Sequence, residues 1–121
     1  MKKINKIKKN FDYIFIEKSS RNISKKYEKI INKKIIIIEP NILELQKIYE
    51  QIEENEKTEI ILNKININSI STSTVEELLN KKIIGKIKYS ENINLIINDN
   101  FNLKHLKKNE RKNILKIIEK I

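Results

Sequence analysis

Two glutamates follow runs of apolar residues that are typical of buried strands. Glu17 comes directly after residues 13–16, and Glu39 comes directly after four consecutive isoleucines at 35–38. Because the carboxyl ends of parallel strands meet at one edge of a sheet, these two carboxylates could face each other there. Such a pair suits acid–base catalysis or a Mg²⁺ site, but strand-end carboxylates also cap helices or pair with lysine. The sequence leaves these alternatives open.

A third apolar run, at residues 59–65, contains Asn63 and Lys64 near its end. At the same edge of a sheet their side chains are well placed to meet a ligand, although Asn-Lys is common in a chain so rich in both residues. The only histidine, His105, lies in a lysine-rich stretch and is expected at the surface. The sequence shows no Ser-His-Asp arrangement, and we assign no residue as catalytic or as a metal ligand, although the alternatives for Glu17 and Glu39 stay open.

The glycine content bears directly on nucleotide binding. Phosphate-binding loops need glycines that bring backbone N–H groups against the phosphates. The one glycine of this chain, Gly85, lies inside an apolar run at 83–89, and neither GxxxxGK[ST] nor GxGxxG occurs. We therefore expect no NTPase or dinucleotide enzyme from this chain alone. Close backbone packing is the role predicted for Gly85.

Composition excludes several other classes. The chain has 121 residues and no cysteine, which rules out disulfides, thiol catalysis and the usual zinc sites. No signal-peptide pattern follows the basic N-terminus, and no stretch approaches the roughly 20 apolar residues of a membrane span. We therefore expect a cytoplasmic protein. Isoleucine, lysine and asparagine dominate the sequence, and since they share A/T-rich codons, we expect an A/T-rich genome behind this bias.

Lysines are concentrated at both ends of a chain whose formal net charge is +10. A basic protein attracts nucleic acid non-specifically, so a small nucleic-acid-binding module is the alternative function. Yet 26 basic residues include only two arginines, which are favoured for bidentate recognition of phosphates and bases. A solvated basic surface is therefore the competing interpretation. The lysines that would bind nucleic acid are Lys2, Lys3, Lys8, Lys9, Lys104, Lys107 and Lys108.

Apolar runs alternate with helical patterns along the chain, which predicts an α/β fold. We expect a mostly parallel four-stranded sheet flanked by helices in three layers. One α/β domain would span residues 1–121, with a basic N-terminal segment at 1–10 and a C-terminal tail and helix at 99–121. The predicted strands are residues 13–16, 35–38, 59–65 and 83–89.

Apolar stripes and capping residues place the helices between these strands. Ser19 or Ser20 would cap the first, and Ser73 with Glu76 would form a capping box at the start of the third. Val75, Leu78 and Leu79 would form the buried face of that third helix. The predicted helices cover residues 23–31, about 41–52, 73–79, 91–98 and 114–121, and the Asn-rich stretches 63–73 and 98–109 are predicted loops.

Taken in order, four segments resemble the C-terminal half of a MinD/ParA-type P-loop ATPase, and most closely the CpaE/TadZ-type ATPases that localise pilus assembly systems. The segments are FDYIFIEKSS, KKIIIIEPNILELQKIYEQI, IILNKIN and IIGKIKYSENINLIIND, within residues 11–100. The resemblance implies that Glu17 stands at the family's magnesium-associated aspartate and Asn63 at its base-contacting position. The chain departs from the pattern because the P-loop half and the proline of the last segment are missing.

The resemblance and these departures together lead to a functional expectation. We expect a non-catalytic or degenerate MinD/ParA-like domain that acts through protein–protein contacts in localising a pilus or secretion machine. Its partner would be another protein or a second copy of the chain. No cofactor is expected, and ATP with Mg²⁺ would bind only if a partner chain supplied the P-loop. The remnant of the nucleotide site would comprise Glu17, Glu39, Asn63 and Lys64.

Overall fold

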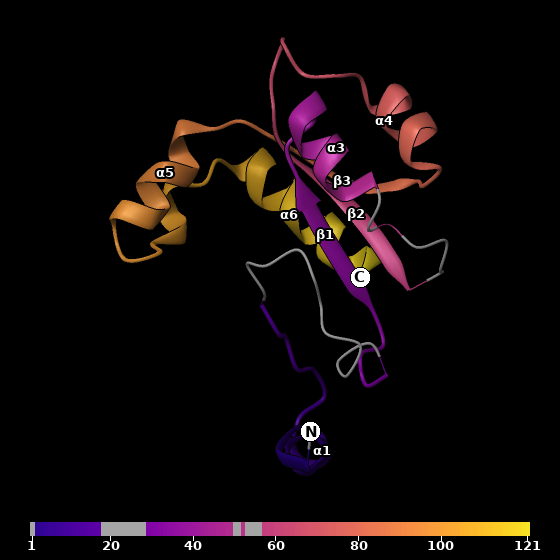
Figure 1. The fold of residues 1–121 in the computed structure, drawn as a ribbon. Helices are drawn as coiled ribbons and strands as arrows, with labels where there is room; N and C mark the ends of the chain where they lie inside the picture. Colours follow the sequence, from indigo (N-terminus) through magenta and orange to yellow (C-terminus); the bar gives the residue numbers. More distant parts are fainter. Residues whose placement is uncertain (1, 18–28, 50–51, 53–56) are drawn as a thin grey trace. The chain divides into compact units, whose positions relative to one another are not determined.

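The computed structural model describes residues 2–17, 29–49, 52 and 57–121 (Figure 1). The chain divides into two compact units, residues 1–32 and residues 33–121. Each unit is described by itself below. The expectation of one domain over residues 1–121 stays a prediction.

The first unit begins with a helix that the sequence patterns did not indicate. Helix α1 spans Lys2–Ile7, and a 3-10 turn, η1, spans Lys8–Asn10. The predicted strand at 13–16 is wrong, because residues 13–17 form no strand and are not part of the sheet. Tyr13 and Phe15 are each 82% exposed. An apolar run specifies a strand only when a neighbouring strand supplies hydrogen-bond partners, and local pattern cannot supply that information. The helix predicted at 23–31 falls mostly outside the described residues.

The second unit is built on a parallel sheet. Strands β1 (Lys34–Ile38), β2 (Thr58–Ile65) and β3 (Ile83–Lys88) lie in the order β1-β2-β3, and both neighbouring pairs are parallel. These strands confirm the predictions at 35–38, 59–65 and 83–89, and with them the α/β class and the parallel sheet. Within the described residues the sheet has three strands rather than four.

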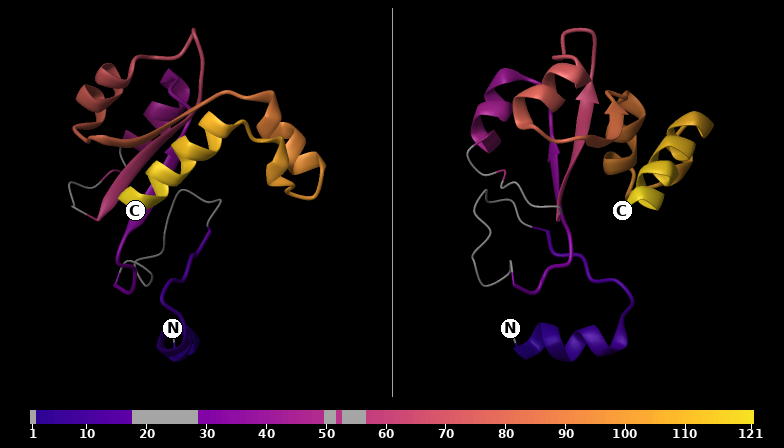
Figure 2. Two further views of the ribbon diagram at one scale, coloured as in Figure 1. Left: turned by 180° about the vertical axis from the view of Figure 1, so that it is seen from behind. Right: turned by 90° about the vertical axis from the view of Figure 1, so that its right-hand side faces the viewer.

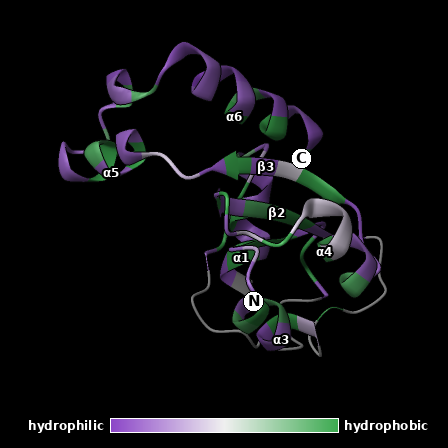
Figure 3. Cartoon of the chain, turned by 90° about the horizontal axis from the view of Figure 1, so that it is seen from above, coloured by the Kyte–Doolittle hydropathy of each residue, from purple (hydrophilic) through white to green (hydrophobic). Residues whose placement is uncertain are grey.

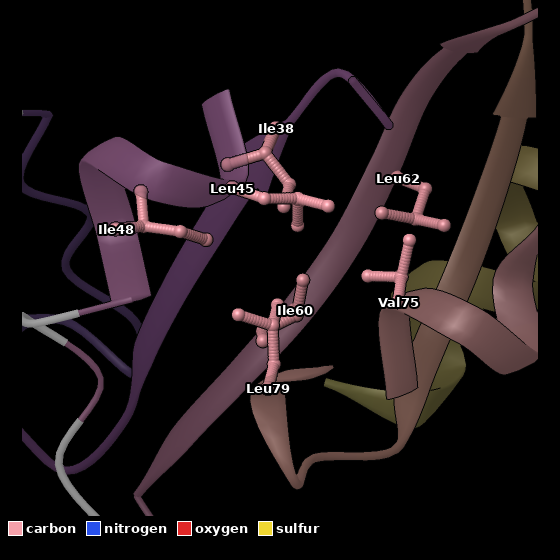
Figure 4. Packing of buried hydrophobic residues seen from close by; sticks show 7 residues of the cluster. All are labelled: Ile38, Leu45, Ile48, Ile60, Leu62, Val75 and Leu79. Carbon is pink, nitrogen blue, oxygen red and sulfur yellow. The ribbon is translucent and has the colours of Figure 1, made fainter. Parts of the chain in front are cut away.

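Helices α3 (Ile42–Tyr49) and α4 (Thr72–Leu79) cover one face of this sheet (Figures 2 and 3). They bury a cluster of aliphatic side chains against β1 and β2 (Figure 4). Burial of one such side chain contributes about 1.5–3 kcal/mol, so this cluster is a main source of stability in the unit. Its members are Ile38, Leu45, Ile48, Ile60, Leu62, Val75 and Leu79.

Residues after β3 form helix α5 (Glu91–Asn98), a 3-10 turn η2 (Leu103–His105) and helix α6 (Lys108–Lys120). Helix α6 lies on the side of the sheet opposite α3 and α4 (Figures 2 and 3). The prediction of α5 is confirmed. The predicted loop at 98–109 is confirmed up to Lys107, apart from η2, and the start of the last helix at 114 is wrong. Helix α6 already begins at Lys108, where polar residues gave no apolar stripe.

Gly85 allows α6 to approach β3. A Cβ atom at this position would lie 2.8 Å from Cγ1 of Ile117, closer than real Cβ contacts allow. The side chain of Ile117 is itself 6% exposed. The predicted packing role of Gly85 is thus confirmed, and α6 is the element that uses it.

Polar side chains fix the starts of α3 and α4. The side-chain oxygen of Asn41 accepts from the backbone N–H of Glu44 at 2.9 Å, so Asn41 caps α3 immediately after Pro40. At α4 the capping residue is Ser71, whose hydroxyl accepts from the backbone N–H of Thr74 at 3.3 Å. The capping box predicted at Ser73 is therefore wrong. Ser71 and Ser73 are both serines followed by a sequence that suits a helix, so residue type alone did not show which of them is the cap.

The buried face of α4 also differs in part from the prediction. Val75 and Leu79 are buried, as expected, but Leu78 is 47% exposed. The helix ends at Leu79, and Asn80 follows in the left-handed conformation with φ 49°. A helix of two turns presents a narrow stripe to the sheet, so adjacent leucines cannot both face it.

Candidate functional site

The carboxyl end of the sheet brings together two of the predicted site residues. Glu39 directly follows β1, and Lys64 lies near the end of β2. The Nζ atom of Lys64 is 3.0 Å from Oε1 of Glu39, and the two side chains are 55% and 46% exposed. Of the alternatives for Glu39, pairing with lysine is the one found. An exposed pair of this kind contributes about 0–1 kcal/mol, so its main effect is to neutralise the carboxylate locally.

The backbone at Lys64 is unusual for a lysine. Its φ is 53°, in the left-handed region, and the pairing of β2 with β3 is irregular between Leu62 and Ile65. A non-glycine residue in this region costs of order 1 kcal/mol. The neighbouring side chain of Asn63 is partly buried. The bulge therefore turns the Lys64 ammonium toward Glu39 at this edge.

Glu17, the remaining member of the predicted remnant, belongs to the first unit, and its side chain is exposed. Its pairing with Glu39 stays a prediction. Among the described residues, no group of three or more histidine, aspartate or glutamate side chains is arranged to hold a metal ion.

Hydroxyl groups gather beside the same edge, at the start of α4. The hydroxyl of Ser71 lies 2.8 Å from that of Thr74 and 3.2 Å from that of Ser73. The preceding turn is fixed by the backbone N–H of Ile70, which donates to the carbonyl of Pro40 at 3.0 Å. These hydroxyls hydrogen-bond to one another and to the helix start, which is the arrangement of a helix cap.

The C-terminal part of the chain contains a polar cluster that sequence reasoning missed. Nε2 of His105 lies 2.8 Å from Oδ2 of Asp99, and the amide of Asn102 donates to the same oxygen at 3.1 Å. The hydrogen bond with His105 is the main cause that lowers the pKa of Asp99. His105 is only 33% exposed at its side chain, so it is more than a solvated tail residue. No local spacing signals such a contact across an irregular turn.

Glu110, in the first turn of α6, holds this helix to α5. Its Oε1 accepts from the side-chain amide of Asn92 and from the backbone N–H of Lys107, each at 3.0 Å. Hydrogen bonds from Ser90 and from the Lys107 backbone lower the pKa of Glu110. The sequence signal was available here, since an acidic residue at the third position of a helix commonly accepts from the N–H of the capping residue.

The lysines considered for nucleic-acid binding are divided between the two units. Lys3 and Lys9 are exposed on α1 and η1, while the ammonium of Lys8 donates to the carbonyl of Ile30 at 2.9 Å. The side chain of Lys2 lies outside the described part of the chain. In the second unit, the exposed group at η2 and the start of α6 comprises Lys104, Lys107 and Lys108.

Helix α6 covers only part of the sheet face on which it packs. Ile36 and Ile38 pack on the α3 side, so Ile37 points to the opposite face, where it is 61% exposed. On α6, Leu115 and Ile118 are 59% and 57% exposed. We call Ile37 and Ile118 the open apolar face, because Leu115, about 200° from Ile117 around the helix, points away from the sheet.

The two parts of this face lie on the same side of the second unit. Ile118 follows Ile117 by about 100° around the helix, on the flank opposite Lys116. Lys116 borders β3 at one edge of the sheet, so Ile118 is turned toward the β1 side. The end of α6 is also held near β1, because Nζ of Lys33 donates to the carbonyl of Ile121 at 2.8 Å. The sequence indicated apolar stripes but not which of them would stay uncovered.

A groove of about 710 Å³ lies between α6 and β3, on the flank of α6 that carries Lys116. Isoleucines from β3, α5 and α6 line its floor, and lysines from β3 and α6 stand around it. We call it the β3–α6 groove. Sequence reasoning did not identify it, because it depends on the crossing of α6 over β3 at Gly85.

No protein-family model, curated protein or solved structure matches this chain. Among the helices of the described residues, none combines the length and the apolar character that crossing a membrane requires.

Proposed function

We propose that this chain is a non-catalytic, degenerate MinD/ParA-like domain that acts through protein–protein contacts. The open apolar face is the observation that carries this proposal. Parallel sheets normally have both faces covered, yet Ile37 and Ile118 are each more than half exposed. Apolar side chains grouped in this way on one face favour a protein partner that covers them.

The carboxyl edge of the sheet supports the non-catalytic part of the proposal. Glu39 already has a partner at this edge, because it forms an ion pair with Lys64. With no P-loop sequence in the chain, the edge offers no glycine-rich backbone for phosphates. Glu39, Asn63 and Lys64 would then be the remnant of a nucleotide site.

The finer architecture follows from the same proposal. The sheet would belong to a three-layer, P-loop-NTPase-like half, with β1 at an edge that a further strand completes. That strand would come from a partner chain. The role implied by the resemblance is the localisation of a pilus or secretion machine.

A photo-crosslinking amino acid at position 37 or position 118 tests the contact. Introduced in cells of the source organism, both positions should yield adducts of the same protein, identified by mass spectrometry. Position 67 provides the matched control, because Ile67 is 99% exposed in a loop away from the face. Equal adduct yields at all three positions would count against the proposal. An adduct with a second copy would identify self-association as the contact.

The non-catalytic claim has a separate test. Calorimetric titration of the purified chain with ATP and Mg²⁺ should give no heat of binding, and phosphate release should stay at the buffer rate. Micromolar binding together with turnover would contradict the claim.

Nucleic-acid binding is the second candidate function. It is favoured by the exposed lysines Lys104, Lys107 and Lys108 near the start of α6, where the helix dipole adds positive potential. If this function holds, a gel shift should show binding at 50 mM salt, with affinity that falls steeply as the salt is raised. Absence of binding at low salt would exclude it.

A further inference from the structure

We propose that the β3–α6 groove binds an acidic, extended peptide segment of a partner protein, which pairs with the free edge of β3. This inference rests on the proposed protein-contact function and names the chemistry of one partner. The groove is a different surface from the open apolar face. Three independent features of the groove support it: its charge, its apolar floor and its backbone edge.

The charge of the groove is strongly positive. Its lining contains five lysines and one carboxylate, that of Glu110. This carboxylate is already engaged by Asn92 and by the Lys107 backbone. Of the lysines, Lys86 on β3 and Lys116 on α6 are both exposed. Neither forms a salt bridge or side-chain hydrogen bond within the described part of the chain, so both are available to a carboxylate ligand.

The floor of the groove is apolar. Ile84 and Ile87 from β3, Ile93 from α5 and Ile114 from α6 line it, and each is partly buried. A fully charged ligand would leave these side chains in contact with water. An extended peptide that alternates acidic and aliphatic residues places one kind of side chain on the lysines and the other on the floor.

The backbone of β3 supplies the third feature. β3 pairs with β2 on one side and is an edge strand among the described residues. The side-chain amide of Asn113 donates to the carbonyl of Lys86 at 2.8 Å. This hydrogen bond from α6 already occupies the carbonyl of Lys86, so a peptide would pair with the remaining backbone groups at this edge. A peptide N–H can take up similar positions along β3, which spans six residues, so a ligand of about the same length suffices.

These features favour a peptide over nucleic acid. Strand addition uses backbone N–H and C=O groups, which nucleic acids lack. None of the residues that line the groove is arginine, the residue best suited to phosphate recognition. Polyanion binding at the same lysines is thus an outcome that the experiment must separate from peptide binding.

Fluorescence anisotropy with a labelled peptide of alternating Glu and Val, eight residues long and blocked at both ends, tests the inference. The intact chain should bind it at low salt and release it as salt rises. A peptide of alternating Lys and Val should not bind. In the double variant Lys86→Glu, Lys116→Glu, the affinity should fall about tenfold or more, because like charges repel. The matched control is Lys82→Glu, Lys112→Glu, which makes the same charge change outside the groove and should bind as the parent does.

Two further results would overturn the inference. N-methylation of alternate peptide bonds removes the strand's donors, so an N-methylated peptide that binds equally well would contradict strand addition. Single-stranded DNA that binds with equal affinity and the same dependence on Lys86 and Lys116 would show a polyanion site only. Circular dichroism of each variant confirms that it is folded.

Failure here is distinguishable from failure of the proposed function. Crosslinking from positions 37 and 118 does not involve the groove lysines. If those adducts form while the peptide fails to bind, only the assignment of the groove is wrong. If the peptide binds and those adducts do not form, the open apolar face is wrong and the groove stands.

Discussion

At the scale of single residues, Gly85 has the clearest structural role. It is the only glycine of the chain, and its missing Cβ atom makes room for three carbon atoms of Ile117. The sequence predicted close packing at Gly85 but could not name the partner, because Ile117 is distant in the chain. The same limit applies to Glu39 and Lys64, whose types and positions were evident while their ion pair depended on the bulge in β2.

Replacement of Gly85 by alanine should destabilise the second unit by about 1–3 kcal/mol, since the added methyl group overpacks a filled site. The second variant Ile117→Ala opens the site and should lower the cost of Gly85→Ala when the two changes are combined. Chemical denaturation of the four proteins of this double-mutant cycle measures the coupling. Additive effects would mean that Ile117 moves away without cost.

At the scale of elements, runs of isoleucine and regular apolar stripes were sufficient to predict β1, β2, β3, α3 and α5. Prediction failed where the answer depended on another part of the chain. Residues 13–16 have the pattern of a strand but no described partner. The first turns of α6 are polar, so no apolar stripe marks the start of this helix. Hydrogen bonds of Glu110 fix it instead.

The start of α4 offers a direct comparison between two neighbouring serines. Ser71→Ala removes the hydroxyl that caps the helix and should lower the free energy of unfolding by about 1 kcal/mol. Ser73→Ala, at the position that the sequence favoured, should change it by less than half as much. Urea denaturation followed by circular dichroism measures both. Equal effects of the two substitutions would contradict the assignment of Ser71 as the cap.

At the scale of the whole molecule, sequence patterns did not reveal the division into two units or most of the polar contacts among α5, η2 and α6, and the helix-start contact of Glu110 was the exception. The contacts of Asp99 lie in an irregular turn, and Asn92 is 18 residues from Glu110. Asp99 and Glu110 are their central acceptors, and hydrogen bonds lower the pKa of both carboxyls. A lowered pKa in the folded state means that the folded chain binds fewer protons than the unfolded chain in acid, which links stability to pH.

Stability should therefore fall as the solution is acidified. The contribution of Glu110 begins to weaken near its ordinary pKa of 4.5, and that of Asp99 near 3.8. Both are lost as pH falls through the lowered values of the folded state. Thermal unfolding at pH 7, 4.5 and 3 measures the loss. The variant Asp99→Asn, Glu110→Gln should be less stable at pH 7 and less sensitive to acid, whereas Asp12→Asn should retain the parent's dependence. Parallel pH profiles for all three proteins would refute the assignment.

The aliphatic core has a consequence for spectroscopy. The chain has no tryptophan, and its described tyrosines, Tyr13, Tyr49 and Tyr89, are 82%, 64% and 50% exposed. Their ultraviolet emission should therefore change little when the core of isoleucine, leucine and valine comes apart. Tyr89, however, lines the β3–α6 groove. The fluorescence of these described tyrosines is thus a poor probe of melting, but that of Tyr89 is a built-in optical probe of whatever occupies the groove, with Tyr89→Phe as the blank.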